Sequence, residues 1–208
     1  MSLDTYANLQ TEIAQHLDRD DLTDHIPTFI TLAEETHRRP TDEGGLRIRQ
    51  MITREAITVD ARQVSLPDGF LNLQTLRLLT TPATELKYID YHELNRVRQE
   101  TTGKPRYFTI GNEFEFDYAP DSSYSGEIVY FKEETALSDS NESNNILAQV
   151  PGAYLYGALV ASAPFLMDDP RIVVWQTLYR AAAQGANAAT KKARRGKHLV
   201  ARNAGSTP

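Results

Sequence analysis

The spacing of apolar residues changes twice along this chain of 208 residues. Near the N-terminus the apolar residues Tyr6, Leu9, Ile13 and Leu17 recur at intervals of three and four, which predicts a helix over residues 5–17. In the middle of the chain the interval is two, the period of a strand, and towards the C-terminus the helical interval returns. The sequence therefore predicts an α+β protein, in which N- and C-terminal helices form a bundle and a small antiparallel β domain is inserted between them.

These changes of period divide the chain into four parts. The expected parts are an N-terminal helical part at 1–46, the inserted β domain at 47–137, a C-terminal helical part at 138–190 that completes the bundle, and a basic tail at 191–208. The polar run SDSNESNN separates the β domain from the helices that follow it. Because the tail has too little apolar area to fold by itself, we expect it to be flexible.

The helices carry recognisable start and stop signals. A second N-terminal helix should begin near Pro27, with Asp24 as its cap. A third helix is expected over residues 150–167, where small residues allow close backbone approach and Pro164 should kink or end it. The fourth should run from 171 to about 189.

The segment NEFEFDYAP gives the strongest strand signal. Its aromatic residues fall on one face, and the opposite face carries three acids, Glu113, Glu115 and Asp117. A pair of carboxylates can support acid/base hydrolysis of a glycan. A solvated strand face is the favoured interpretation, because all three acids share the polar side.

Charge is divided unevenly between the two ends of the chain. From 171 to 208 there is no acidic residue, and the eight basic residues are Arg171, Arg180, Lys191, Lys192, Arg194, Arg195, Lys197 and Arg202. Removing this charge of +8 from the overall −6 leaves −14 on residues 1–170. Such a division is typical of a tail that binds an acidic partner while the body stays soluble.

Several classes of site are not expected. The chain has no cysteine, which excludes disulfides and thiolate metal sites. The acidic run DRDDLTDH lacks the Gly and Glu of a calcium loop, and the five histidines show no zinc-protease spacing, so no metal or cofactor is expected. The N-terminus does not resemble a signal peptide and no apolar run is long enough to span a membrane, so we expect a cytoplasmic protein without a membrane partner.

Four segments then carry a resemblance: HIPTFITLAEE, SLPDGFLNL, TGKPRYFTIGNEFEFDYAP and NNILAQVPGAYLYGALVASAPFLMDD. In this order they resemble the head-to-tail adaptor, or connector, family of short-tailed bacteriophages, over residues 3–179. The resemblance implies a non-enzymatic virion protein of the neck, assembled in the host cytoplasm as a ring, commonly of twelve copies, between the portal and the tail nozzle. The segment HRRPTDEGG and the basic tail depart from the family pattern.

Two sets of residues can be given roles in such an assembly, the first from the resemblance and the second from the acidic face itself. The tail would bind the portal through Lys191, Lys192, Arg194, Arg195, Lys197, Leu199, Val200 and Arg202. If the acidic face of Glu113, Glu115 and Asp117 lines the channel, it would let DNA pass without specific recognition and without sticking.

Two other functions remain open from the sequence. The basic tail could belong to a nucleic-acid-binding regulator, although it lacks aromatic residues for base stacking. The acidic face could belong to an acid/base glycan hydrolase.

Overall fold

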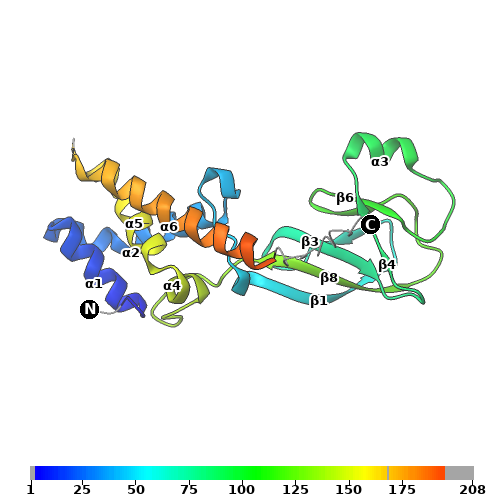
Figure 1. The fold of residues 1–208 in the computed structure, drawn as a ribbon, viewed down its shortest axis with the longest axis horizontal. Helices are drawn as coiled ribbons and strands as arrows, with labels where there is room; N and C mark the ends of the chain where they lie inside the picture. The colour runs from blue at the N-terminus through cyan, green and yellow to red at the C-terminus, as the bar shows by residue number, and fades with distance from the viewer. Residues whose placement is uncertain (1–2, 168, 195–208) are drawn as a thin grey trace, which may run out of the picture. The chain divides into compact units, whose positions relative to one another are not determined.

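Figure 1 shows the computed structural model of the protein, which describes residues 3–167 and 169–194. It confirms the predicted α+β class. The described residues of Met1–Leu9 and Arg49–Gln149 form one compact unit, here called the β unit. Those of Gln10–Ile48 and Val150–Pro208 form the second, here called the helical unit.

Six α-helices and four short 3-10 helices occur in the described part of the chain. The α-helices are α1 (Tyr6–Leu17), α2 (Ile26–Arg38), α3 (Tyr91–Val97), α4 (Asn145–Gln149), α5 (Pro151–Ala161) and α6 (Arg171–Arg194). The 3-10 helices are η1 (Asp20–His25), η2 (Thr41–Glu43), η3 (Arg49–Met51) and η4 (Ala163–Phe165).

The strands of the β unit form two four-stranded sheets. They are β1 (Ile52–Val59), β2 (Gln63–Ser65), β3 (Phe70–Leu78), β4 (Thr84–Glu85), β5 (Lys87–Tyr88), β6 (Tyr107–Ile110), β7 (Glu113–Phe116) and β8 (Tyr124–Lys132). One sheet has the order β1-β8-β3-β4 and the other β2-β7-β6-β5. The strand pairs are antiparallel, as predicted, apart from β5 and β6, which run parallel.

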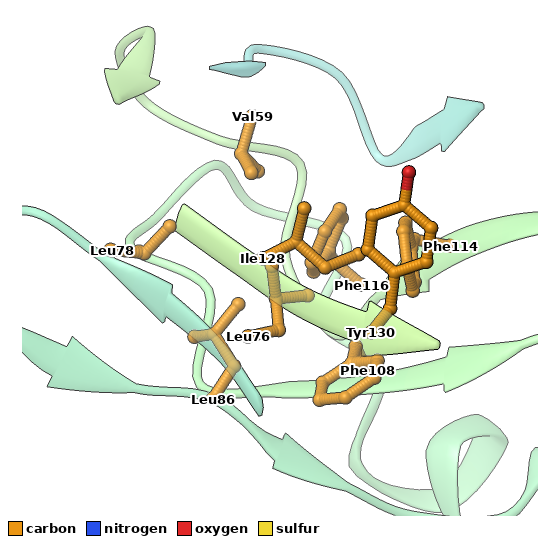
Figure 2. Packing of buried hydrophobic residues seen from close by; sticks show 9 residues of the cluster. All are labelled: Val59, Leu76, Leu78, Leu86, Phe108, Phe114, Phe116, Ile128 and Tyr130. Atoms are coloured by element: carbon orange, nitrogen blue, oxygen red, sulfur yellow. The ribbon is translucent and has the colours of Figure 1, made fainter. Parts of the chain in front are cut away.

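Side chains from both sheets form the core of the β unit, shown in Figure 2. The cluster consists of Val59, Leu76, Leu78, Leu86, Phe108, Phe114, Phe116, Ile128 and Tyr130. Phe114 and Phe116 are fully buried, so the apolar face predicted for this strand is the inner one. The ring of Phe108 meets that of Phe114 edge to face, with 6.0 Å between their centroids.

In the helical unit, α5 packs against both α2 and α6. Gly157 explains how closely the three helices approach. A Cβ atom at this position would lie 3.0 Å from the Ala33 side chain of α2 and 3.3 Å from the Tyr179 ring of α6. Glu34 of α2 is buried here and accepts a hydrogen bond of 3.0 Å from the Tyr154 hydroxyl of α5. As predicted, the helix ends before Pro164, which lies in η4.

Three local expectations were wrong. Asp24 does not cap α2, because it lies inside η1, and His25 occupies the N-cap position without a side-chain hydrogen bond. The helix α4 was not expected. Finally, α6 continues to Arg194 and does not end near Ala189, so the first residues of the expected flexible tail are helical.

Candidate assembly surfaces

The acidic face predicted on β7 has three different environments. Glu113 is exposed and accepts a hydrogen bond of 3.3 Å from the Ser65 hydroxyl. Glu115 is half-buried and pairs with Arg98, whose Nη1 lies 2.8 Å from its carboxylate. The two side chains therefore remain at the surface, but only Glu113 lacks a cationic partner among the ion pairs of the described residues.

Asp117 belongs to the interior and not to an exposed face. It is only 1% exposed, and one carboxylate oxygen accepts the backbone N–H groups of Arg106, at 2.9 Å, and Tyr107, at 3.1 Å. These bonds fix the chain where it enters β6. The expectation that Asp117 shares a solvated wall was wrong, because the strict alternation ends with β7 at Phe116. No spacing rule in the sequence distinguishes this carboxylate from its two neighbours.

The basic end of the chain begins on the last turn of α6. Lys191 and Lys192 are exposed there, where positive charge is favoured by the negative end of the helix dipole. Arg194 ends the helix. The other residues predicted to bind the portal, Arg195, Lys197, Leu199, Val200 and Arg202, lie outside the described residues.

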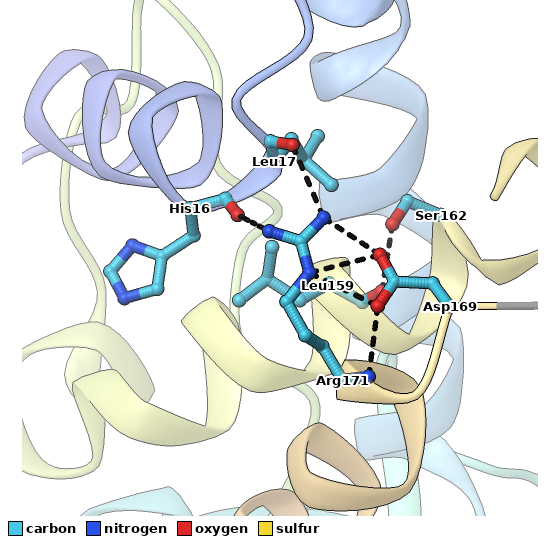
Figure 3. Close-up of polar contacts among 6 residues, drawn as sticks. All are labelled: His16, Leu17, Leu159, Ser162, Asp169 and Arg171. Atoms are coloured by element: carbon cyan, nitrogen blue, oxygen red, sulfur yellow. Dashed lines mark hydrogen bonds and ion pairs between the residues drawn. The ribbon is translucent and has the colours of Figure 1, made fainter.

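Arg171 forms a polar cluster that sequence reasoning missed, since it was counted only as part of the basic end (Figure 3). Its Nη1 donates to the carbonyl of His16, at 2.9 Å, and its Nη2 to that of Leu17, at 3.4 Å. These carbonyls end α1 and have no partner within that helix. The guanidinium also contacts the Asp169 carboxylate at 2.7–3.0 Å. It therefore links the end of α1 to the start of α6.

The electrostatics of this cluster favour its charged form. Side-chain hydrogen bonds from Arg171 hold the pKa of Asp169 below its usual value, and the same bonds raise the pKa of Arg171. The Arg171 guanidinium also lies over the Trp175 ring, 5.1 Å from its centroid. Beside the pair is a cavity of about 200 Å³, lined by Leu17, Asp18, Arg19, Leu166, Met167, Asp169 and Arg171.

A comparison with protein families identifies the kind of protein that carries these surfaces. The family model described as SU10 adaptor protein matches residues 4–203, which is most of the chain. The chain belongs to the SU10 adaptor family. This is a family of phage head-to-tail adaptors, so the predicted resemblance is confirmed. A search of curated proteins found no match.

An SU10 adaptor is a structural component of the virion that assembles with other phage proteins. Two of the three acids considered for glycan hydrolysis are engaged in contacts within the chain. Glu115 is engaged by Arg98 and Asp117 by two backbone amides, so these carboxylates do not form a free acid/base pair.

Two further findings concern the described part of this SU10 adaptor. Within residues 3–167 and 169–194, no group of three or more His, Asp or Glu side chains is placed to hold a metal ion. None of the helices traced there combines the length and the apolar character that crossing a bilayer requires.

Proposed function

We propose that this SU10 adaptor assembles into a ring of identical copies at the neck of the virion, after synthesis in the host cytoplasm, and joins the portal to the tail around the DNA channel. Membership of the adaptor family, over residues 4–203, is the observation that carries the proposal. We take twelve copies as the ring size, from the resemblance stated above. The mechanism is binding without turnover, driven by buried interface and by electrostatic docking.

The portal contact is assigned to the basic C-terminal segment. Lys191 and Lys192 support this assignment, because they are exposed on the last turn of α6 and no acidic residue follows residue 169. An acidic surface on the portal would attract this end of the subunit, while the body, with its net negative charge, would be steered away from that surface. The β unit is then available to meet the tail nozzle.

Glu113 and Glu115 are the residues proposed to line the DNA channel. Asp117 does not belong to this wall, because it is buried. Carboxylates on the channel wall would repel the phosphates of passing DNA and prevent sticking. The double variant Glu113→Lys and Glu115→Lys should slow DNA ejection from assembled particles. Ejection at the normal rate would show that these side chains do not face the DNA.

Assembly itself is tested by light scattering of the purified protein, alone and mixed with the portal protein of the same phage. The proposal requires a larger complex of fixed stoichiometry in the mixture. Its absence would count against the portal contact. Particles that lack this protein should lose their genome and fail to attach a tail, and particles that retain both functions would contradict the proposed role.

A further inference from the structure

The helical unit has two outer faces that point in different directions. Its central helix, α5, packs against both α2 and α6, and the three helices meet at Gly157, where Ala33 and Tyr179 both lie close to the position of a Cβ atom. Ala33 and Tyr179 are buried, so the opposite sides of α2 and α6 face away from α5. Each outer side is available to another molecule.

The outer face of α6 carries an apolar, uncharged stripe. Val174, Leu178, Ala181 and Gly185 follow one another at intervals of four, three and four, and all are exposed. Val174 is 56% exposed and Leu178 38%. Between Arg171 and Lys191 the helix carries a single charged residue, Arg180. A solvated face normally carries alternating charges, so this one has the composition of a contact surface.

Gly185 adds a second observation on the same face. A Cβ atom at this position would meet no atom of the described residues within 4 Å. Glycine in a helix interior costs about 1 kcal/mol relative to alanine, and no contact with residues 3–167 or 169–194 requires it here. A residue without a side chain at this place allows a neighbouring helix to approach closely.

The outer face of α2 has a complementary composition. Thr28, Thr31, Leu32 and Glu35 lie on one side of the helix, and all four are exposed. Leu32 is 40% exposed, although it is aliphatic. Glu35 is the charged residue of this face, and Asp20, Asp21 and Asp24 of η1 lie just before the helix.

Charge distinguishes the two sides of the helical unit. The segment 10–48, which contains α2, has nine acidic and four basic residues, for a net charge of −5. The helix α6 has five basic and no acidic residues, for a net charge of +5. Arg171 is paired with Asp169 of its own chain, but the other basic residues of α6 and the acidic segment that contains α2 still carry opposite charges. Each face therefore attracts the other and repels a copy of itself.

We propose that the outer face of α6 docks on the outer face of α2 of a second copy of this chain. The inference rests on the proposed ring and assigns the surface that builds it. Since the two faces differ, the contact is head to tail, and each copy keeps one free face for the next. Repetition of such a contact closes into a ring when its rotation allows, whereas a contact between two α6 faces would stop at a dimer.

The absence of cysteine from the natural sequence makes a direct test possible. A double variant with Leu178→Cys and Leu32→Cys carries one thiol on each proposed face. Treated with a short bismaleimide at high protein concentration, it should give a ladder of dimers, trimers and higher multimers. An equal mixture of the two single variants should give only a dimer that contains one copy of each.

A matched control pairs Leu178→Cys with Ser122→Cys, which is exposed in the β unit. The protein with this control pair of cysteines should remain monomeric after treatment with the bismaleimide. Strong dimers from either single variant alone would indicate a symmetric contact and would overturn the proposal. If the mixture with the portal protein forms large assemblies in light scattering but gives no ladder, this surface is wrong while the ring stands. If that mixture gives neither assemblies nor a ladder, both the surface and the ring are contradicted.

Val174→Glu provides a second test that does not depend on thiol chemistry. Because Val174 is already exposed, the variant should fold with an unchanged circular dichroism spectrum. It should nevertheless lose the assemblies that the natural sequence forms with the portal protein in light scattering. Assemblies equal in size and amount to those of the natural sequence would overturn the docking surface.

Discussion

At the scale of single residues, Asp117 shows how one buried carboxylate supports the β unit. Its substitution by alanine leaves the N–H groups of Arg106 and Tyr107 without their acceptor. We expect Asp117→Ala to lower the free energy of unfolding by roughly 2–3 kcal/mol, because unpaired buried donors keep their full desolvation cost. Urea unfolding followed by circular dichroism measures this.

The control for this variant is Glu113→Ala, which removes an exposed acid four residues away. Its effect should stay within about 0.5 kcal/mol, as for most surface substitutions. Equal losses of stability in the two variants would show that the amide contacts of Asp117 contribute nothing measurable.

His37 makes the stability of the helical unit depend on pH. It is buried beside the rings of Tyr154 and Tyr179, and neither ring nitrogen makes a hydrogen bond of good geometry. Burial, with a smaller contribution from Arg38, lowers the pKa of His37 to about 4. In the unfolded chain the imidazole takes up a proton near pH 6.5. Stability should therefore fall as the pH drops from about 6.5 to about 4, by up to about 3 kcal/mol.

The fluorescence of Trp175 can measure this loss of stability, because Trp175 is the one tryptophan of the chain and is buried in the helical unit. Its fluorescence should report a pH-dependent loss of stability that is smaller in His37→Phe. Comparing the two proteins cancels the titration of the carboxylates that they share. Parallel pH curves for the two proteins would show that His37 is not the titrating group.

At the scale of elements, periodicity predicted α1, α2 and the strand β7, because each buries one face of a regular pattern. Details that depend on backbone geometry were missed. Asp24 has the right chemistry for a cap, but η1 runs directly into α2, and the N-cap residue His25 has φ −91° and ψ −12°, which is already helical. The end of α6 was missed because its last turns are rich in alanine, which favours a helix without an apolar pattern.

The candidate surfaces were less predictable than the elements. Alternation placed Glu113, Glu115 and Asp117 together, but the turn into β6 that buries Asp117 is a tertiary feature. Arg171 has a local partner in Asp169, two residues before it, but its contacts with His16 and Leu17 are far away in the sequence. Long-range contacts of this kind cannot be derived from spacing.

Replacing glycine by alanine should have opposite effects at two positions of the helical unit. Gly185→Ala should stabilise the monomer by up to about 1 kcal/mol, because alanine is the better helix former and its Cβ meets no atom within 4 Å in the part of the chain that the structure describes. Gly157→Ala should destabilise it, because the Cβ would lie 3.0 Å from Ala33 and 3.3 Å from Tyr179. Thermal unfolding followed by Trp175 fluorescence compares the two. A lower melting temperature for Gly185→Ala in the monomer would show that this glycine has a role within the chain.

At the scale of the whole molecule, charge is divided unevenly along the chain. The first 170 residues carry −14 and the last 38 carry +8. The acidic parts of two subunits repel each other, whereas the basic C-terminal segment is attracted to any acidic surface, including that of another copy. The order of the two charges along the chain therefore favours a subunit that approaches its partner with the C-terminal end first.

The double variant Lys191→Glu and Lys192→Glu tests this directed approach. If the C-terminal segment binds the portal, the substitutions should weaken binding by about tenfold or more, since two attractive contacts become repulsive. They should also flatten the decrease of affinity with salt, because fewer charge contacts remain to be screened. Titration of labelled protein with portal at two salt concentrations measures both effects.

The control, Lys87→Glu with Arg96→Glu, makes the same change of net charge on exposed residues of the β unit and should bind nearly as the natural protein does. An equal loss of binding in the control would mean that net charge alone, and not this segment, governs the association.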